Sequence, residues 1–157
     1  MQFLLTLIVL FLNVQPVFGQ PAVTCAENGC VAGTYISTYT DKSTPFYECP
    51  TREVSDYITL VTSMLRLQAA MGVMPNISPV TGEPEYTGES KAILDKYRIK
   101  AGIKTFDQAI GMCQKGKSGT KATVMNYQKD GLSIWVSPRR SGSQPFWMPV
   151  ASAIPIR

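Results

Sequence analysis

The chain of 157 residues carries 15 Lys and Arg, 11 Asp and Glu and no histidine, which gives a formal net charge of +4. Without histidine, Ser-His-Asp and Cys-His catalysis and most catalytic zinc sites are excluded, because each needs an imidazole as base or ligand. The sequence also lacks an apolar run of the roughly 20 residues that a membrane-spanning helix needs.

The N-terminus has the pattern of a secretory signal peptide. The run Phe3–Leu12 is apolar except for Thr6, and Val17-Phe18-Gly19 supplies small or neutral residues before a cleavage point. No Lys or Arg precedes the run, and a buried N-terminal strand or helix is the alternative. We expect residues 1–19 to be removed and residues 20–157 to be exported as one domain, periplasmic or secreted.

Four cysteines in an exported chain favour disulfides over free thiols. Three pairings are possible, and the sequence does not choose between them. We favour Cys25–Cys30, because residues 26–29 can turn tightly between them, which leaves Cys49–Cys113. A four-cysteine zinc site is the rival, but Cys49 and Cys113 are not a close pair, so no metal and no cofactor is expected.

The first predicted element after the signal peptide is a strand over Val31–Thr40. Ile36 and Thr38 alternate with Tyr35 and Ser37, and this period of two in β-branched and aromatic residues is typical of a strand.

A long helix is predicted over Thr51–Met71, begun by Thr51 as a cap and ended by Gly72. Its residues fall into two apolar stripes and one polar stripe. The stripes are Val54, Tyr57, Ile58, Val61 and Leu65; Leu60, Met64, Leu67 and Met71; and Ser55, Thr59, Thr62 and Arg66. A helix that is apolar around most of its circumference is a buried one, so we expect it to form the core.

The connection Val73–Gly88 is long, rich in Pro and Gly, and acidic through Glu83 and Glu85. A connection of this length is either a functional loop or a solvated linker, and we favour the linker.

Two shorter helices follow. One is predicted over Glu89–Ala101, with Ile93, Leu94 and Tyr97 turned inward and Lys91 and Asp95 paired at i, i+4. The other begins at Thr105 with a capping box and places Cys113 on its buried face, where a disulfide partner is expected.

The segment Gly111–Ser118 matches the phosphate-loop pattern of two glycines followed by Lys-Ser. That loop works only after a strand and before a helix, since backbone amides at the helix N-terminus bind the phosphates. Here a helix precedes the segment and a strand follows it, so no nucleotide is expected to bind.

The C-terminal stretch Thr120–Ile156 contains three β-rich runs separated by turns. It holds both tryptophans and the Arg139-Arg140 pair. We expect Trp135 to be buried. Phe146 and Trp147 are neighbours in a strand and point to opposite faces, so one of them is a candidate for exposure. The predicted binding residues are Arg139, Arg140, Phe146 and Trp147.

This stretch resembles bacterial Src-homology-three-type barrels. The resemblance rests on residues 119–124 (Gly-Thr-Lys-Ala-Thr-Val), the turn at 129–131, Ile134-Trp135-Val136, and Trp147-Met148-Pro149 with Ala151-Ser152. The family's opening strand, its Arg-Ser-Gly-Pro loop and its late tyrosine have no counterpart here. The resemblance covers about a quarter of the chain and implies a small barrel that binds cell-wall peptide or another envelope component.

Charge divides the chain into two halves. Gln20–Ser90 carries three basic and eight acidic residues, whereas Lys91–Arg157 carries twelve basic and three acidic ones. Either the basic half attracts an anionic partner, or the two halves neutralise one another within the molecule.

Together these patterns predict an α+β fold: an N-terminal strand and three helices packed on a C-terminal antiparallel β-meander or small barrel. Residues 20–118 would be mainly helical and residues 119–157 β-rich. We expect a non-catalytic bacterial envelope protein whose basic C-terminal half binds an anionic envelope component or a protein partner.

Two alternatives remain from other functional classes. The first is an inhibitor or immunity protein that acts through the acidic loop 73–88. The second is a glycan hydrolase that uses two carboxylates, Glu83 with Glu85 or Asp41 with Glu48.

Overall fold

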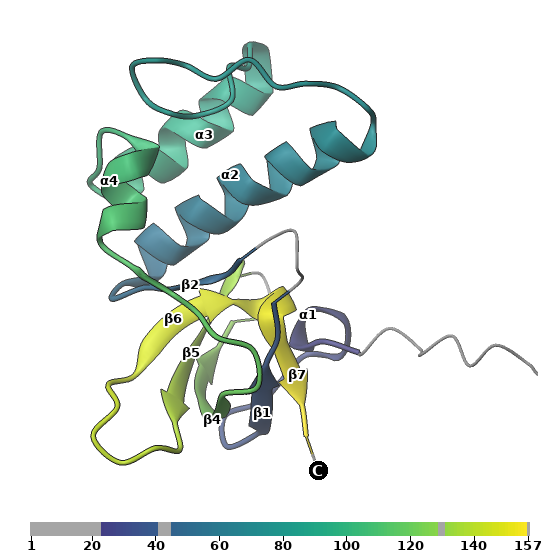
Figure 1. Cartoon of the computed structure of the whole chain (residues 1–157), viewed down its shortest axis with the longest axis vertical. Coiled ribbons are helices and arrows are strands. Elements are labelled where there is room, and N and C mark those ends of the chain that lie inside the picture. The colour runs from purple at the N-terminus through teal and green to yellow at the C-terminus, as the bar shows by residue number, and fades with distance from the viewer. Residues whose placement is uncertain (1–22, 41–44, 129–130, 157) are drawn as a thin grey trace, which may run out of the picture.

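The computed structural model describes residues 23–40, 45–128 and 131–156, and the predicted signal peptide lies outside them. Figure 1 shows two layers, an antiparallel sheet and a group of helices stacked against one end of it, so the protein is an α+β fold. None of the described helices is both long and apolar enough to cross a membrane.

The α-helices lie between residues 25 and 111, and a short 3₁₀ turn lies near the C-terminus. They are α1 (Cys25–Asn28), α2 (Arg52–Ala70), α3 (Gly88–Lys100), α4 (Phe106–Gly111) and the 3₁₀ turn η1 (Val150–Ser152). The three expected helices are therefore present as α2, α3 and α4, and α1 and η1 were not expected.

Strands come from both ends of the chain. They are β1 (Tyr35–Thr38), β2 (Tyr47–Glu48), β3 (Gln114–Lys115), β4 (Lys121–Tyr127), β5 (Ser133–Pro138), β6 (Phe146–Pro149) and β7 (Ala153–Pro155). Five of them form one antiparallel sheet in the order β6-β5-β4-β1-β7, and β2 pairs with β3. β1 covers four of the ten residues expected to form the N-terminal strand.

The sheet has one apolar face that forms a core of its own. Period-two alternation turns inward the side chains of Ile36, Ala122, Val124, Ile134, Val136, Phe146, Met148 and Ala153. Helix α1 and its disulfide cover this core, since Cys25 and Cys30 belong to the same buried cluster. The β-rich part thus draws on residues near both ends of the chain, not only on its last third.

Helix α2 begins as predicted, because the Thr51 side chain accepts a hydrogen bond from the backbone N–H of Val54 at 3.4 Å. Burial is confined to its first half, which packs on β5 and β6 below and on α3 and α4 above. Leu67 and Met71 in the second half are 62% and 61% exposed. The expectation of a helix buried around most of its circumference is therefore wrong for the part of α2 that follows Val61.

The connection 73–88 is an ordered loop with many internal contacts. Its backbone folds back at an isolated bridge between Ile77 and Pro84, and Thr81 accepts a hydrogen bond from the N–H of Phe106 at 2.7 Å. Glu83 is only 5% exposed. The expectation of a solvated linker is wrong, because this carboxylate anchors the loop to the helices beneath it.

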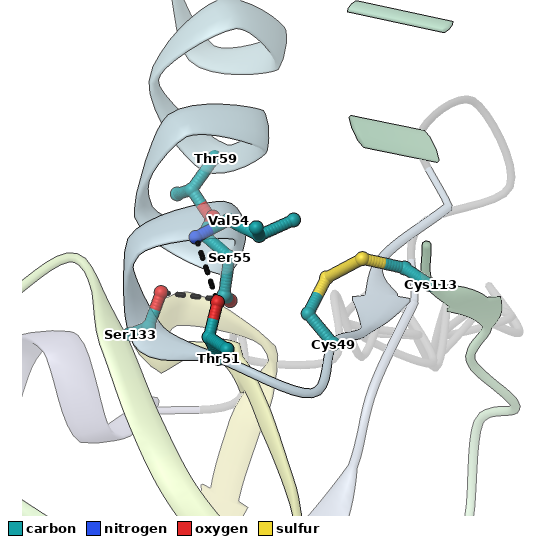
Figure 2. Close-up of a disulfide and its surroundings, with 7 residues drawn as sticks. All are labelled: Cys49, Thr51, Val54, Ser55, Thr59, Cys113 and Ser133. Atoms are coloured by element: carbon teal, nitrogen blue, oxygen red, sulfur yellow. Dashed lines mark hydrogen bonds between the residues drawn. A yellow bond between two sulfur atoms is a disulfide. The ribbon is translucent and has the colours of Figure 1, made fainter. Parts of the chain in front are cut away.

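Both favoured disulfides are present, Cys25–Cys30 and Cys49–Cys113. The second joins the end of β2 to the start of β3, with 4.4 Å between the two Cα atoms, and so closes the base of the helical unit (residues 51–112). Figure 2 shows this bond beside the first turn of α2, where Ser133 of the sheet donates a hydrogen bond to Ser55 at 2.8 Å.

The segment Gly111–Ser118, which matches the phosphate-loop pattern, has a role in core packing. Gly116 is buried, and a Cβ atom added there would overlap the ring of Phe46, itself a core residue. Helix α4 precedes the segment and β4 follows it, the reverse of the order that phosphate binding requires.

Candidate functional site

The outer face of the sheet gathers aromatic and basic side chains from four adjacent strands. Along each strand, the residues that alternate with the buried ones point away from the core. We call this surface the aromatic–basic face, and it consists of Tyr35, Lys121, Trp135, Arg139 and Trp147. The strands β1, β4, β5 and β6 are neighbours in the sheet, so the face is about 14 Å wide.

Trp135 and Trp147 form one end of this face. They are directly opposite in the β5–β6 register, and their rings stack at 6.2 Å between centroids with 18° between the planes. Both are half-buried, and neither belongs to a buried cluster of the core. A cross-strand pair of this kind stabilises the sheet and presents a broad apolar surface to solvent.

The backbone of Trp147 is also tied to the base of the helical unit. Cys49 and Trp147 exchange two backbone hydrogen bonds of 2.8 Å, so the outer edge of β6 is paired at this point. Because Cys49 is held in its disulfide, the position of the Trp147 strand is fixed from both sides.

Basic side chains form the other end of the face. The guanidinium carbon of Arg139 lies 4.6 Å from the centroid of the Tyr35 ring, a cation–π contact. The backbone N–H of Arg139 donates to the carbonyl of Lys121, which brings Lys121 alongside. Arg140 follows in the exposed loop between β5 and β6.

Of the four predicted binding residues, the structure brings Arg139 and Trp147 to the same face and Arg140 to its border. Phe146 is 8% exposed and belongs to the core, so it is the inward member of its pair. Trp135 was expected to be buried and instead lies half-exposed on the outer face. Its neighbours Ile134 and Val136 could have revealed this, since both are apolar and share the opposite face.

Few ion pairs neutralise the basic half from within. Those among the described residues join Arg52 to Asp56, Lys91 to Asp95, and Arg98 to both Asp95 and Glu83. Of these pairs between described residues, Arg98–Glu83 is the one that links the acidic half to the basic half. In the described part of the chain, no ion pair engages Lys121, Arg139 or Arg140.

The acidic loop 73–88 uses its carboxylates internally. Glu83 accepts a hydrogen bond of 2.5 Å from the Tyr57 hydroxyl and pairs with Arg98. Burial, and then the Glu83 carboxylate, raise the pKa of Tyr57, which therefore remains a hydrogen-bond donor. Glu85 is exposed and accepts a hydrogen bond from the Asn76 amide. These contacts hold the loop in place and leave Glu83 inaccessible to a partner.

The other predicted carboxylate pair consists of Asp41 and Glu48, and of the two only Glu48 lies among the described residues. Glu48 is half-buried in β2, where burial raises its pKa while the Lys117 charge opposes the shift. Its predicted partner Asp41 lies outside the described residues. Within 23–40, 45–128 and 131–156, no cluster of three or more Asp, Glu, Cys or His side chains is arranged to hold a metal ion.

Comparison of the chain with protein-family models, with curated proteins and with solved structures finds no match. A functional assignment therefore rests on the residues and geometry described above.

Proposed function

We propose that this protein is an exported, non-catalytic binding protein of the bacterial cell envelope, and that the aromatic–basic face binds an anionic envelope component. One observation carries the proposal: Lys121 and Arg139, which have no carboxylate partner among the described residues, lie on the same outer face as the stacked Trp135–Trp147 pair. Cations attract an anionic ligand, and an exposed aromatic surface adds contact area once the ligand arrives.

Export is supported by the two disulfides, which form and persist in oxidising compartments outside the cytoplasm. The pattern of residues 1–19 agrees with this route. We place the protein in the periplasm or in the secreted fraction.

A small barrel of the bacterial Src-homology-three type is part of the proposal. Its support is the single buried cluster to which all five strands of the sheet contribute, together with the pairing of Cys49 to the outer edge of β6. The helical unit would then be an insertion between the first and second barrel strands, β1 and β4.

The test is co-sedimentation of the secreted protein with purified peptidoglycan sacculi. The double variant Arg139→Glu/Arg140→Glu should lose most of the binding, and Trp147→Ala should weaken it by about tenfold, the loss of one aromatic contact. The matched control is Lys96→Glu/Lys100→Glu, which changes net charge by the same amount at exposed positions of α3.

The proposal requires that the control variant retain binding. If both double variants lose binding equally, the attraction is a property of net charge and not of this face. If the unaltered protein does not sediment with sacculi at low salt, peptidoglycan is not the anionic component.

A further inference from the structure

Both tryptophans of the chain lie at one end of the aromatic–basic face, where Trp135 and Trp147 form a platform. Their centroids are 6.2 Å apart, so the rings are offset rather than superposed and part of each ring face stays uncovered. The planes differ by only 18°, so the two rings present one surface of nearly uniform orientation. Such a surface packs well on a flat ligand ring with apolar C–H groups, as a sugar ring has.

A row of hydroxyl-bearing side chains crosses the face next to the platform. Tyr35 lies opposite Thr123, and Thr123 lies opposite Ser137, so these residues form one line across β1, β4 and β5. Ser137 follows Trp135 by two residues, which places the row about 7 Å from the platform on the same side of the sheet. Hydroxyl groups both donate and accept hydrogen bonds, as the hydroxyls of a sugar do.

The cations lie on the far side of this row. Arg139 follows Trp135 by four residues, about 13 Å along the strand, and its backbone N–H donates to the carbonyl of Lys121. The cation–π contact with Tyr35 holds the Arg139 guanidinium over the face. A ligand that uses the whole face therefore has a neutral ring at one end and a negative charge at the other.

This separation of rings and charge distinguishes a glycan from a single-stranded nucleic acid, which also stacks on aromatic side chains. A nucleic acid carries a phosphate at every nucleotide, so its binding sites place cations beside the stacking residues. The residue opposite Trp135 on β4 is Asn126, and the row next to the platform carries hydroxyls rather than charges. The arrangement therefore favours a glycan whose charged group is separate from the stacked ring.

We propose that the anionic component is an acidic polysaccharide, with one sugar ring packed on the Trp135–Trp147 platform and a carboxylate or phosphate further along the glycan bound by Lys121 and Arg139. This assignment rests on the proposed function, which requires only that an anion bind the face, and adds that a sugar ring covers the platform.

Tryptophan fluorescence tests the ring contact directly, since the two tryptophans of the chain both belong to the platform. Titration of the secreted protein with polygalacturonate, a polymer of carboxylated sugars, should move the emission to shorter wavelength with a dissociation constant of about 100 µM. Polyglutamate carries carboxylates without sugar rings and should leave the emission unchanged. Dextran carries rings without charge and should bind at least about tenfold more weakly than polygalacturonate.

Variants separate the ring contact from the charge contact, and affinity electrophoresis through gels that contain each polymer measures them. Trp147→Ala should weaken polygalacturonate binding about tenfold and leave polyglutamate binding unchanged, whereas Trp147→Phe should retain both. The double variant Lys121→Gln/Arg139→Gln should weaken binding of both polymers. Ile99→Ala is the control and should change neither, because Ile99 is 75% exposed on α3 in the helical unit.

Equal affinity for the two acidic polymers, with no change in emission when polygalacturonate binds, would overturn the assignment to a polysaccharide, while sedimentation with sacculi would still support the proposed function. Tighter binding of oligodeoxythymidylate than of polygalacturonate, lost in Trp147→Ala, would assign the face to a nucleic acid instead. A protein that binds neither sacculi nor either acidic polymer would overturn the proposed function together with this assignment.

Discussion

Glu83 shows how one buried carboxylate can hold a long loop in place. It accepts from Tyr57 of α2 and pairs with Arg98 of α3, so a single side chain joins the loop to two helices. Both oxygens are occupied, and the Arg98 side chain is itself 18% exposed. Removing the Glu83 charge leaves the mostly buried Arg98 with Asp95 as its remaining ion-pair partner among the described residues, and this loss costs more than the Glu83–Arg98 pair contributes.

Glu83→Gln should therefore lower the free energy of unfolding by about 3 kcal/mol. The measurement is urea unfolding followed by circular dichroism. Glu85→Gln in the same loop is the matched control and should change stability by less than about 0.5 kcal/mol, because Glu85 is exposed. Equal effects of the two substitutions would show that the loop is not anchored by Glu83.

Ionisation of Glu48 makes the free energy of unfolding depend on pH, and the direction of its pKa shift sets the sign of this dependence. Burial raises its pKa above the ordinary value of 4.5, so the folded state binds the proton more tightly than the unfolded state does. The stability linked to this group is complete below pH 4.5 and is lost as the pH rises through the raised pKa.

Glu48→Gln removes that ionisation, so the variant should be more stable than the parent at pH 7. The gain should vanish below the ordinary glutamate pKa, where the parent carboxyl is neutral as well. Thermal unfolding across the pH range measures it. A gain of the same size at every pH would assign the effect to packing rather than to charge.

Single residues were predicted well where the determining contacts are local. Thr51 and Thr105 cap α2 and α4 as expected, because each accepts from a backbone N–H three residues away. The burial of Glu83 was not predicted, because its partners Tyr57 and Arg98 are distant in sequence. The exposure of Trp135 was predicted wrongly, because the size of its side chain was given more weight than the buried positions of Ile134 and Val136 on either side.

At the scale of elements, the two disulfides stabilise very different loops. Cys25–Cys30 closes a turn with a sequence separation of 5, whereas Cys49–Cys113 spans a separation of 64. In the chain-entropy model the stabilisation grows with the logarithm of the loop length. The longer bond therefore constrains the unfolded chain more.

Replacing Cys49 and Cys113 together by serine should lower the free energy of unfolding by about 4 kcal/mol, and replacing Cys25 and Cys30 by about 2 kcal/mol. Urea unfolding of the two double variants gives the comparison directly. Equal losses would indicate that local strain or residual structure, not loop length, sets the contribution of each bond.

Elements with a strong local pattern were predicted and those without one were not. The period of the apolar residues predicted α2 and α3, and alternation predicted the two faces of β1 and the opposite faces of Phe146 and Trp147 in β6. The two-residue strands β2 and β3 are too short to have a period. Their existence depends on the pairing of Tyr47 with Lys115 across the helical unit.

At the scale of the whole molecule, the order of strands was beyond prediction because the decisive pairing is non-local. β1 pairs with β4, joining Ser37 to Lys121, although the entire helical unit lies between them in sequence. No turn signal specifies such a contact, since only the shared core brings the strands together. The charge asymmetry, in contrast, was visible from composition, and among the described residues a single ion pair, Arg98–Glu83, crosses between the two halves.

The disulfide Cys49–Cys113 holds the two ends of the helical unit together, so the length of this unit can vary between related chains. The helical unit begins and ends beside the paired strands β2 and β3, where the Cα atoms of Cys49 and Cys113 lie 4.4 Å apart, a separation typical of neighbouring antiparallel strands. A segment of any length whose ends meet there fits without altering the strand register. The helical unit can thus be replaced or changed in length as one segment. Insertions and deletions between related chains should therefore occur between Cys49 and Cys113, while the strands of the sheet keep their lengths.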